Sequence, residues 1–145
     1  MAESTFRKWI TSTLKENGYF AQSIEVMFGL GTPDIYTSKN GKTIWFETKY
    51  YKGNKAALRG TQLSWMQRHA NVGGGHAYLV VKNITANGSF ISFYSDRLLM
   101  ENQKYMTIKG EDFILPRLVE PEYKIKSNKK ELIQIMENLW KNLNY

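Results

Sequence analysis

The sequence predicts a single α/β domain with a mixed central sheet flanked by helices. Its 145 residues fit one domain and leave little room for a second. Hydrophobic residues make up 42% of the chain and aromatic residues 14%, which is too apolar for a disordered protein. Segments with helical spacing alternate with short strand-like runs, and this alternation indicates the α/β class.

The first elements are predicted to be a helix and three strands. Apolar residues recur at helical spacing over residues 5–17: Phe6, Trp9, Ile10 and Leu14. Gly18 predicts the end of this helix, and a strand is expected over 20–28. Two short strands, 34–38 and 43–49, then flank Asn40-Gly41. Asn-Gly between two such runs is the strongest short-range signal of a β-hairpin.

A second helix is expected after a loop. The segment 50–60 is basic and has no clear pattern, so it is predicted to be a loop. Thr61 is the expected N-cap of a helix over about 62–71. Residues 77–81 form a continuous apolar run, typical of a strand buried on both faces. Because a helix connects strand 43–49 to strand 77–81, the two are parallel if they share a sheet.

The C-terminal part of the chain carries one strong signal. A strand is expected over 90–95, whereas 96–126 is predicted to be irregular. Asn128 and Glu131 resemble a capping box that opens a helix ending at about residue 143. The apolar face of this helix contains Leu132, Ile135, Met136, Leu139, Trp140 and Leu143. This face is expected to cover the core. A dimer surface is the alternative, because Trp140 and Tyr145 are costly to expose.

Composition excludes several classes of function. The chain has no cysteine, so it has no disulfide, thiolate catalyst or cysteine-based metal centre. Its net charge of +7 favours polyanionic partners such as nucleic acid or an acidic membrane surface. No apolar run approaches the roughly 18 residues that span a bilayer, and the N-terminus does not resemble a signal peptide. We therefore expect a cytoplasmic protein without a membrane partner.

The register of the predicted hairpin follows from its loop. With two loop residues at 40 and 41, the numbers of facing residues add up to 81. Ile35 then faces Phe46 and Thr37 faces Ile44, and the side with Ile35, Ile44 and Phe46 is the expected core face.

The opposite side of the hairpin brings acidic residues together. Asp34 is expected to face Glu47, and Lys49 lies on the same side as Glu47 because side chains alternate along a strand. Facing Cβ atoms lie about 4.5–5.5 Å apart, and two carboxylates at that separation repel each other. A divalent cation with oxygen ligands would remove this repulsion.

These residues suit phosphodiester hydrolysis. Asp34 and Glu47, together with the backbone carbonyl of Thr48, could hold one or two Mg²⁺ ions that polarise a phosphate and activate water. Lys49 could orient that water or offset charge on the phosphate. Oxygen ligands without His or Cys favour Mg²⁺ or Mn²⁺ over zinc. Each residue alone is explained by a turn or a solvated strand face, but all three in one register favour a catalytic site.

Two segments of this sequence resemble a known nuclease signature. Gly31-Thr32-Pro33-Asp34 followed by Phe46-Glu47-Thr48-Lys49 is similar to the motif of the PD-(D/E)XK nuclease superfamily. Thr61-Gln62, the glycine turn at 73–75 and the strand at 77–81 make the chain similar to the VRR-NUC branch, which is related to Holliday-junction resolvases and includes small phage nucleases. The resemblance covers roughly residues 4–82.

The resemblance implies a restriction-endonuclease-like fold: a helix, a three-strand meander, a helix and a strand. Residues 1–145 would then form a single nuclease domain, with a core at about 4–95 and a C-terminal extension at about 96–145. The resemblance also implies that Asp34 and Glu47 are metal ligands, that Lys49 is the catalytic lysine and that Gln62 is an accessory residue of the active site. Family members often carry a further acidic ligand on the first helix, for which Glu3 is the candidate.

Basic residues near the predicted site are candidates for DNA binding. Lys52, Lys55 and Arg59 follow the active-site strand and could hold phosphates that flank the scissile one. The alternative for this segment is a solubilising loop. Lys82, at the end of the fourth strand, is a further candidate.

The sequence thus predicts a Mg²⁺-dependent DNA endonuclease, with branched or structured DNA as the expected substrate. Within enzymes, the alternative is a restriction-like or end-processing nuclease on duplex or single-stranded DNA. The alternatives of another class are a non-catalytic DNA-binding module and a protein-interaction domain that uses the last helix. A homodimer is expected if the substrate is a junction, because two strands must then be cut. For a protein of phage origin, the location would be the host cytoplasm.

Overall fold

The structure is a computed structural model that describes residues 2–24, 31–72 and 76–143. The helices are α1 (Ala2–Glu16), α2 (Gly60–Asn71), α3 (Asp96–Asn102), the short 3-10 helix η1 (Gln103–Tyr105) and α4 (Lys129–Lys141). The strands are β1 (Phe20–Ser23), β2 (Ile35–Lys39), β3 (Lys42–Lys52), β4 (Ala57–Arg59), β5 (Ala77–Thr85), β6 (Gly88–Ser95), β7 (Thr107–Lys109), β8 (Asp112–Ile114) and β9 (Tyr123–Lys126).

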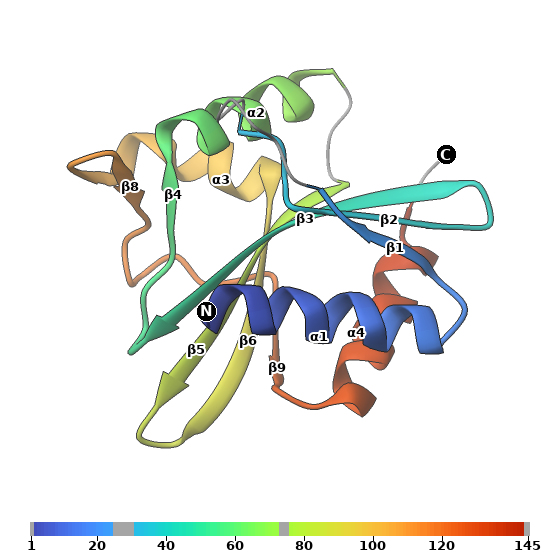
Figure 1. Ribbon diagram of the computed structural model, residues 1–145. Coiled ribbons are helices and arrows are strands. Elements are labelled where there is room, and N and C mark those ends of the chain that lie inside the picture. Colours follow the sequence, from blue (N-terminus) through green and yellow to red (C-terminus); the bar gives the residue numbers. More distant parts are fainter. Residues whose placement is uncertain (1, 25–30, 73–75, 144–145) are drawn as a thin grey trace.

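A six-stranded mixed sheet organises the molecule. Its strand order is β1-β2-β3-β5-β6-β9, and a small second sheet has the order β4-β8-β7. The helices α1 and α4 cover one face of the main sheet, whereas α2 and α3 lie on the other face (Figure 1). β3 and β5 are parallel, and the other neighbouring strands of this sheet are antiparallel. The predicted α/β class, the three-strand meander and the mixed sheet are therefore confirmed.

The hairpin between β2 and β3 has the predicted register. Ile35 pairs with Phe46, and Thr37 pairs with Ile44. Asn40 has φ 53° and Gly41 has φ 76°, which are the positive angles that a two-residue type I′ turn requires. The turn thus sets which side chains of β3 point to each face of the sheet.

One hydrophobic core lies between the sheet and the pair α1 and α4. Ile35, Ile44 and Phe46 belong to it, as predicted for this face of the hairpin. The predicted apolar face of α4 also belongs to it: Leu132, Ile135, Met136, Leu139, Trp140 and Leu143. The last helix therefore covers the core, as expected. Tyr145, which the alternative of a dimer surface also included, lies outside the described residues.

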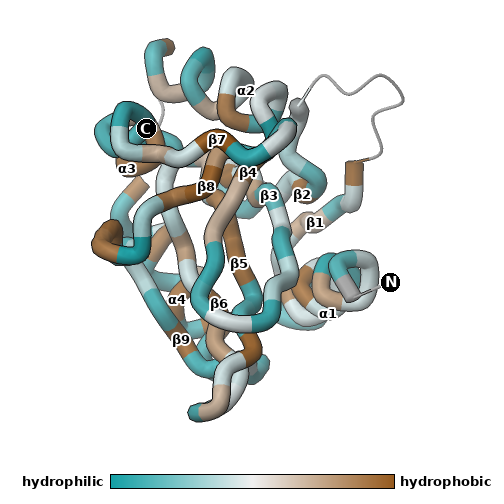
Figure 2. The backbone as a smooth tube through the Cα atoms, turned by 90° about the vertical axis from the view of Figure 1, so that its left-hand side faces the viewer, coloured by the Kyte–Doolittle hydropathy of each residue, from teal (hydrophilic) through white to brown (hydrophobic). Residues whose placement is uncertain are grey.

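The second core lies on the opposite face and includes side chains of α2, α3 and β4. β5 contributes to both cores, because Val80 belongs to the first and Leu79 and Val81 to the second. This strand runs through the middle of the molecule as a largely hydrophobic segment (Figure 2). The prediction of a strand buried on both faces is confirmed.

Two predictions for the segment before α2 are wrong. Residues 50–60 are not a loop: β3 continues to Lys52, and β4 covers 57–59. The parallel pairing with β5 extends to Lys52 and satisfies the backbone there. Thr61 is not the N-cap of α2; the N-cap is Arg59, whose N–H donates to Oε1 of Gln62 at 3.0 Å.

The prediction that 96–126 is irregular is also wrong. This segment forms α3, η1 and three short strands, of which β9 extends the main sheet by pairing with β6. The expected strand at 20–28 is seen as β1 over 20–23, and its positions 25–28 lie outside the described residues. No helix in the described part of the chain is long and apolar enough to span a membrane.

Candidate active site

The predicted catalytic residues line one cavity of about 270 Å³. It lies where β2 begins, beside the middle of β3 and the start of α2. The predicted residues in its lining are Glu3, Asp34, Glu47, Lys49, Arg59 and Gln62. Four segments of the chain thus meet at one site.

Asp34 is held by hydrogen bonds from Thr48. The Thr48 N–H donates to Oδ1 at 3.0 Å, and the Thr48 hydroxyl donates to Oδ2 at 2.6 Å. Arg7 of α1 is also close, with its Nη1 3.6 Å from Oδ2. Burial raises the pKa of Asp34 above its usual value, and the Thr48 hydrogen bonds, Arg7 and Lys49 oppose that rise.

The pairing of Asp34 differs in one respect from the predicted one. The β2–β3 ladder ends at Ile35 and Phe46, so Asp34 lies just before the strand and does not pair with Glu47. The Asp34 carboxylate instead turns toward Thr48. Both carboxylates nevertheless line the same cavity.

Glu47 and Lys49 are charged groups with little access to water. Glu47 is 4% exposed and Lys49 is 9% exposed. Burial raises the pKa of Glu47 well above its usual value, and the nearby charges of Asp34 and Glu3 raise it further, whereas Lys49 and Arg7 lower it. The folded protein therefore pays an electrostatic cost at this site that a bound cation would relieve.

Gly31 explains how the start of α2 comes to lie beside Asp34. Its φ of +79° is a left-handed conformation, which favours glycine. A Cβ placed on Gly31 would lie 2.0 Å from the backbone oxygen of Thr61 and 2.8 Å from the backbone N of Gln62. Only a residue without a side chain allows this contact between the two segments.

The oxygen donors of the cavity fit a hard divalent cation. Asp34 and Glu47 supply carboxylates. The Thr48 carbonyl lies on the Asp34 side of β3, because the N–H and C=O of one strand residue point the same way. The described residues contain no group of three or more acidic, His or Cys side chains placed to hold a metal. Two carboxylates with a carbonyl and water match Mg²⁺, which keeps several waters when bound.

The predicted DNA-binding residues are separated by the fold. Arg59 lines the active-site cavity itself, and Lys55 lines a different cavity. Lys52 is exposed at the end of β3. Lys82 lies on the opposite face from Glu47, with its Nζ 5.9 Å from the centre of the Phe6 ring. Lys82 therefore does not line the active-site cavity, and its role in DNA binding stays a prediction.

Two contributors to the site were not predicted from the sequence. Arg7 contacts Asp34, and its only available signal was that it follows Glu3 by four residues on the first helix. The Thr48 hydroxyl also holds Asp34, whereas the sequence suggested only the Thr48 carbonyl as a functional group.

The mixed sheet, the hairpin and the buried acid–lysine cavity define a nuclease of the PD-(D/E)XK class. The sequence matches the archaeal Holliday junction resolvase (Hjc) family over residues 8–120, and the chain belongs to that family. The fold is similar to that of Archaeoglobus fulgidus Hjc, a Holliday junction resolvase from an archaeal hyperthermophile, with a TM-score of 0.54. The two share 15% sequence identity, over 83% of this chain and 88% of that one. No curated protein sequence gives a match.

These comparisons confirm the resemblance and the restriction-endonuclease-like fold. They also extend the related region, because the family match continues to residue 120 whereas the motifs reached only residue 82. Family membership makes the chain a nuclease that binds DNA.

Proposed function

We propose that this chain is a Mg²⁺-dependent endonuclease that hydrolyses DNA phosphodiester bonds in Holliday junctions or similar branched DNA. The observation that carries the proposal is that Asp34, Glu47 and Lys49 line one cavity in a chain of the Hjc family. The low exposure of Glu47 and Lys49 supports a chemical role, because burying a charge is costly and buried charged groups in a cavity cluster at functional sites.

Each residue has a defined task in this proposal. Asp34 and Glu47, with the Thr48 carbonyl, bind the cation, and Thr48 and Arg7 hold the Asp34 carboxylate in place. When bound, the cation polarises the phosphate and makes water a stronger nucleophile. Lys49 offsets the negative charge that develops on the phosphate as water attacks and the P–O bond to the leaving oxygen breaks.

Two accessory residues complete the proposed site. Gln62 is fixed by the Arg59 N–H and borders the cavity at the start of α2. Glu3, on the first turn of α1, lies near enough for its charge to raise the pKa of Glu47, and we assign it as an additional acidic group for the cation. Mn²⁺ is expected to substitute for Mg²⁺, because the donors are oxygen atoms.

Junction cutting implies a homodimer, since two strands must be cut and each cavity can hold only one scissile phosphate. We place the enzyme in the cytoplasm together with its DNA substrate. Light scattering with and without a four-way junction tests the assembly. A single copy bound per junction would argue for the alternative of a restriction-like or end-processing nuclease.

Cleavage of labelled DNAs tests the proposal directly. A four-way junction, a linear duplex and a single strand are each incubated with Mg²⁺, Ca²⁺ or a chelator. We expect Mg²⁺-dependent cutting of the junction by the wild type and none by Asp34→Ala or Lys49→Ala, with folding and DNA affinity largely kept. Lys141→Ala, at the exposed end of α4, is the control and should cut normally.

The outcomes separate the functional classes. Equal cutting of the linear duplex would favour the restriction-like or end-processing alternative. Binding without cutting under all metal conditions would indicate a non-catalytic DNA-binding module. Full activity of Asp34→Ala would exclude the proposed site.

A further inference from the structure

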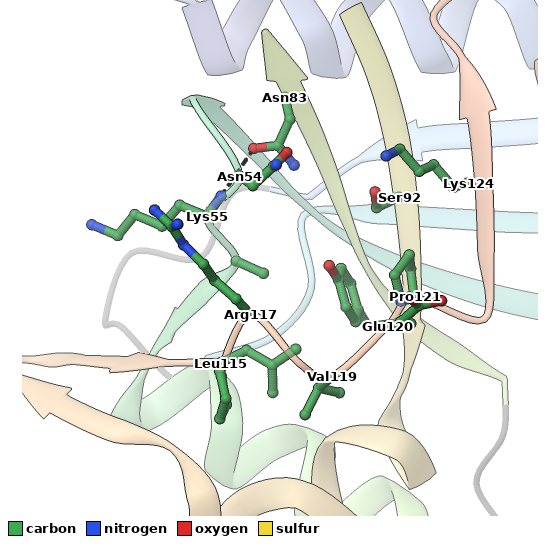
Figure 3. A pocket seen from close by; sticks show the side chains of 13 residues that line it. Asn54, Lys55, Asn83, Ser92, Leu115, Arg117, Val119, Glu120, Pro121 and Lys124 are labelled. Carbon is green, nitrogen blue, oxygen red and sulfur yellow. Dashed lines mark hydrogen bonds between the residues drawn. The ribbon is translucent and has the colours of Figure 1, made fainter. Parts of the chain in front are cut away.

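A second cavity, of about 340 Å³, lies on the same face of the sheet as the active site. Its base is formed by β5 and β6, and its sides by the loop before β4 and by residues 115–121 (Figure 3). No motif of the sequence analysis includes the segment 115–124, and the mechanism proposed above does not use it.

Basic side chains from three separate segments line this cavity. Lys55 comes from the loop before β4, Arg117 from the segment after β8 and Lys124 from β9. Lys55 and Arg117 lie on one side of the cavity and Lys124 lies on the other (Figure 3). None of the three forms an ion pair with a carboxylate within the described ranges. Glu120 also lines the cavity, so the balance is three positive charges against one negative charge.

The proximity of Lys55 and Arg117 favours an anion. Two like charges held on one side of a cavity repel each other, and an anion between them removes that repulsion. Guanidinium and ammonium groups together are the usual partners of phosphate oxygens in DNA complexes.

The base of the cavity carries buried polar groups. Asn83 is 6% exposed and Ser92 is 4% exposed. The Asn83 Oδ1 accepts a hydrogen bond from the Lys55 N–H at 3.2 Å, which fixes the loop that carries Lys55. Its amide group keeps donors that match phosphate oxygens. The Tyr94 hydroxyl is buried, which raises its pKa, and a hydrogen bond with Ser92 lowers it.

The second cavity lies a short distance from the active site. Arg59 lines the first cavity and Lys55 the second, and four residues of chain span at most about 14 Å. The sheet gives a similar separation: Asn83 pairs with Tyr51, four residues after Glu47, which is roughly 13 Å along β3 and about 5 Å across to β5. One DNA strand advances about 3.4 Å per nucleotide along the helix axis and further between successive phosphates, so this separation corresponds to at most about four nucleotides.

We propose that this cavity is a second phosphate-binding site, which holds the DNA backbone within about four nucleotides of the scissile phosphate. This inference rests on the proposed function, because it requires DNA in the first cavity. Lys55, Arg117 and Lys124 neutralise the phosphate, and the buried amide of Asn83 orients the loop that carries Lys55. The C-terminal segment thereby helps to fix the position of the DNA strand on the enzyme.

DNA binding by paired variants tests this site. The full chain carrying Asp34→Asn, to prevent cutting, is compared with and without Arg117→Ala/Lys124→Ala. The matched control is Lys130→Ala/Lys141→Ala, which removes the same charge from exposed positions of α4. Circular dichroism and thermal melting establish that each protein is folded.

The salt dependence of binding gives the decisive readout. We expect the magnitude of the slope of log K against log salt to decrease by about 0.9 in Arg117→Ala/Lys124→Ala, since one lost duplex phosphate contact contributes about 0.9. The control should keep the wild-type slope. With the catalytic Asp34 restored, the variant should have a raised KM and an unchanged kcat. An affinity and slope equal to those of the control would overturn the proposal.

Two further measurements identify the source of the phosphate. Shortening the DNA to one nucleotide on one side of the cut should weaken binding by the wild type but not by the double variant. Binding of dTMP that depends on Arg117 and Lys124, together with unchanged DNA affinity, would assign the cavity to a free nucleotide and overturn the proposal. Loss of all DNA binding by the Asp34→Asn parent would instead contradict the proposed function.

Discussion

The carboxylate of Asp34 is held by Thr48, the residue that follows Glu47 in the chain. The Thr48 N–H and hydroxyl donate to different oxygens of Asp34, at 3.0 Å and 2.6 Å. One strand residue therefore fixes the first carboxylate, while its neighbour supplies the second. Because hydrogen bonds to the charged form lower a pKa, these contacts oppose the effect of burial on Asp34.

Replacement of Thr48 by Val should impair catalysis without changing the fold. The variant keeps the side-chain shape and the backbone hydrogen bond but loses the hydroxyl contact to Asp34. We expect the free energy of unfolding to fall by about 1–3 kcal/mol. We also expect cleavage to need a higher Mg²⁺ concentration, measured by metal titration of junction cutting.

Thr13→Val is the matched control for this experiment. The Thr13 hydroxyl is buried and has no hydrogen-bond partner in the described residues. Its removal should leave stability unchanged or raise it, because no hydrogen bond is lost. An equal loss of activity in Thr13→Val would show that Thr48 acts only through packing.

Glu47→Gln should stabilise the metal-free protein while abolishing cleavage. The pKa of Glu47 is raised by burial and by Asp34, so ionised Glu47 destabilises the folded state above the folded pKa. The wild type should therefore lose stability, relative to the variant, as pH rises through that pKa. Thermal melts of both proteins in chelator, from weakly acidic to weakly alkaline pH, measure this difference.

Adding divalent cations tests the same electrostatic cost from the opposite direction, through the change in melting temperature. Mg²⁺ or Ca²⁺ should raise the melting temperature of the wild type at weakly alkaline pH, because a ligand that binds only the folded state stabilises it. The same ions should have little effect on Glu47→Gln. Equal stabilisation of both proteins would place the cation elsewhere.

The central part of the fold could be predicted because local signals determine it. Asn40-Gly41 sets the turn, the turn sets the register, and the register decides which residues of β2 face those of β3. Glu47 and Lys49 share a face because side chains alternate along the strand. The parallel pairing of β3 and β5 followed from the helix between them. These steps need no information about distant residues.

The remaining features depend on tertiary contacts that have no local signal. β4, β7 and β8 are three residues long and are stabilised by pairing with one another, so no periodicity reveals them. Arg7 reaches Asp34 because α1 packs against β1 and β3, a tertiary contact that no local pattern predicts. The face on which Lys82 lies depends on its pairing with Tyr50 of β3, which the sequence alone does not give.

Gly31→Ala should disrupt the active site, and its cost in stability should exceed the cost of placing an alanine in a left-handed backbone conformation. The new Cβ would lie 2.0 Å from the Thr61 backbone oxygen, so α2 or the segment before Asp34 must shift. Gly110→Ala is the matched control, since Gly110 also has a positive φ, of +62°, but nothing within 4 Å of an added Cβ. The control should cost about 1 kcal/mol from the left-handed conformation.

The comparison of the two glycine variants uses both unfolding and cleavage. Gly31→Ala should lose more stability than Gly110→Ala and should lose cleavage, because Gln62 and Asp34 no longer share one cavity. Similar unfolding midpoints with intact cleavage in both variants would mean that the Gly31 contact has no role in the site.

Glu131→Gln should reduce stability in a pH-dependent manner. Oε1 of Glu131 accepts a hydrogen bond from the Lys126 N–H at 2.9 Å, and Oε2 accepts one from Asn128 at 3.2 Å. These contacts lower the pKa of Glu131 below its ordinary value of 4.5. A lowered folded pKa contributes stability above the unfolded value, and that contribution disappears as pH falls through the folded pKa.

The wild type should therefore be more stable than Glu131→Gln at neutral pH, and the two should converge in strong acid. Urea unfolding at a series of pH values measures the difference. Glu137→Gln, an exposed change on the same helix, controls for loss of one negative charge on α4. A difference that stays constant across the whole pH range would mean that the carboxylate charge plays no part in the cap. In that case the acid would hold the start of α4 better than the amide through hydrogen-bond geometry, and the capping box would not depend on the ionisation of Glu131.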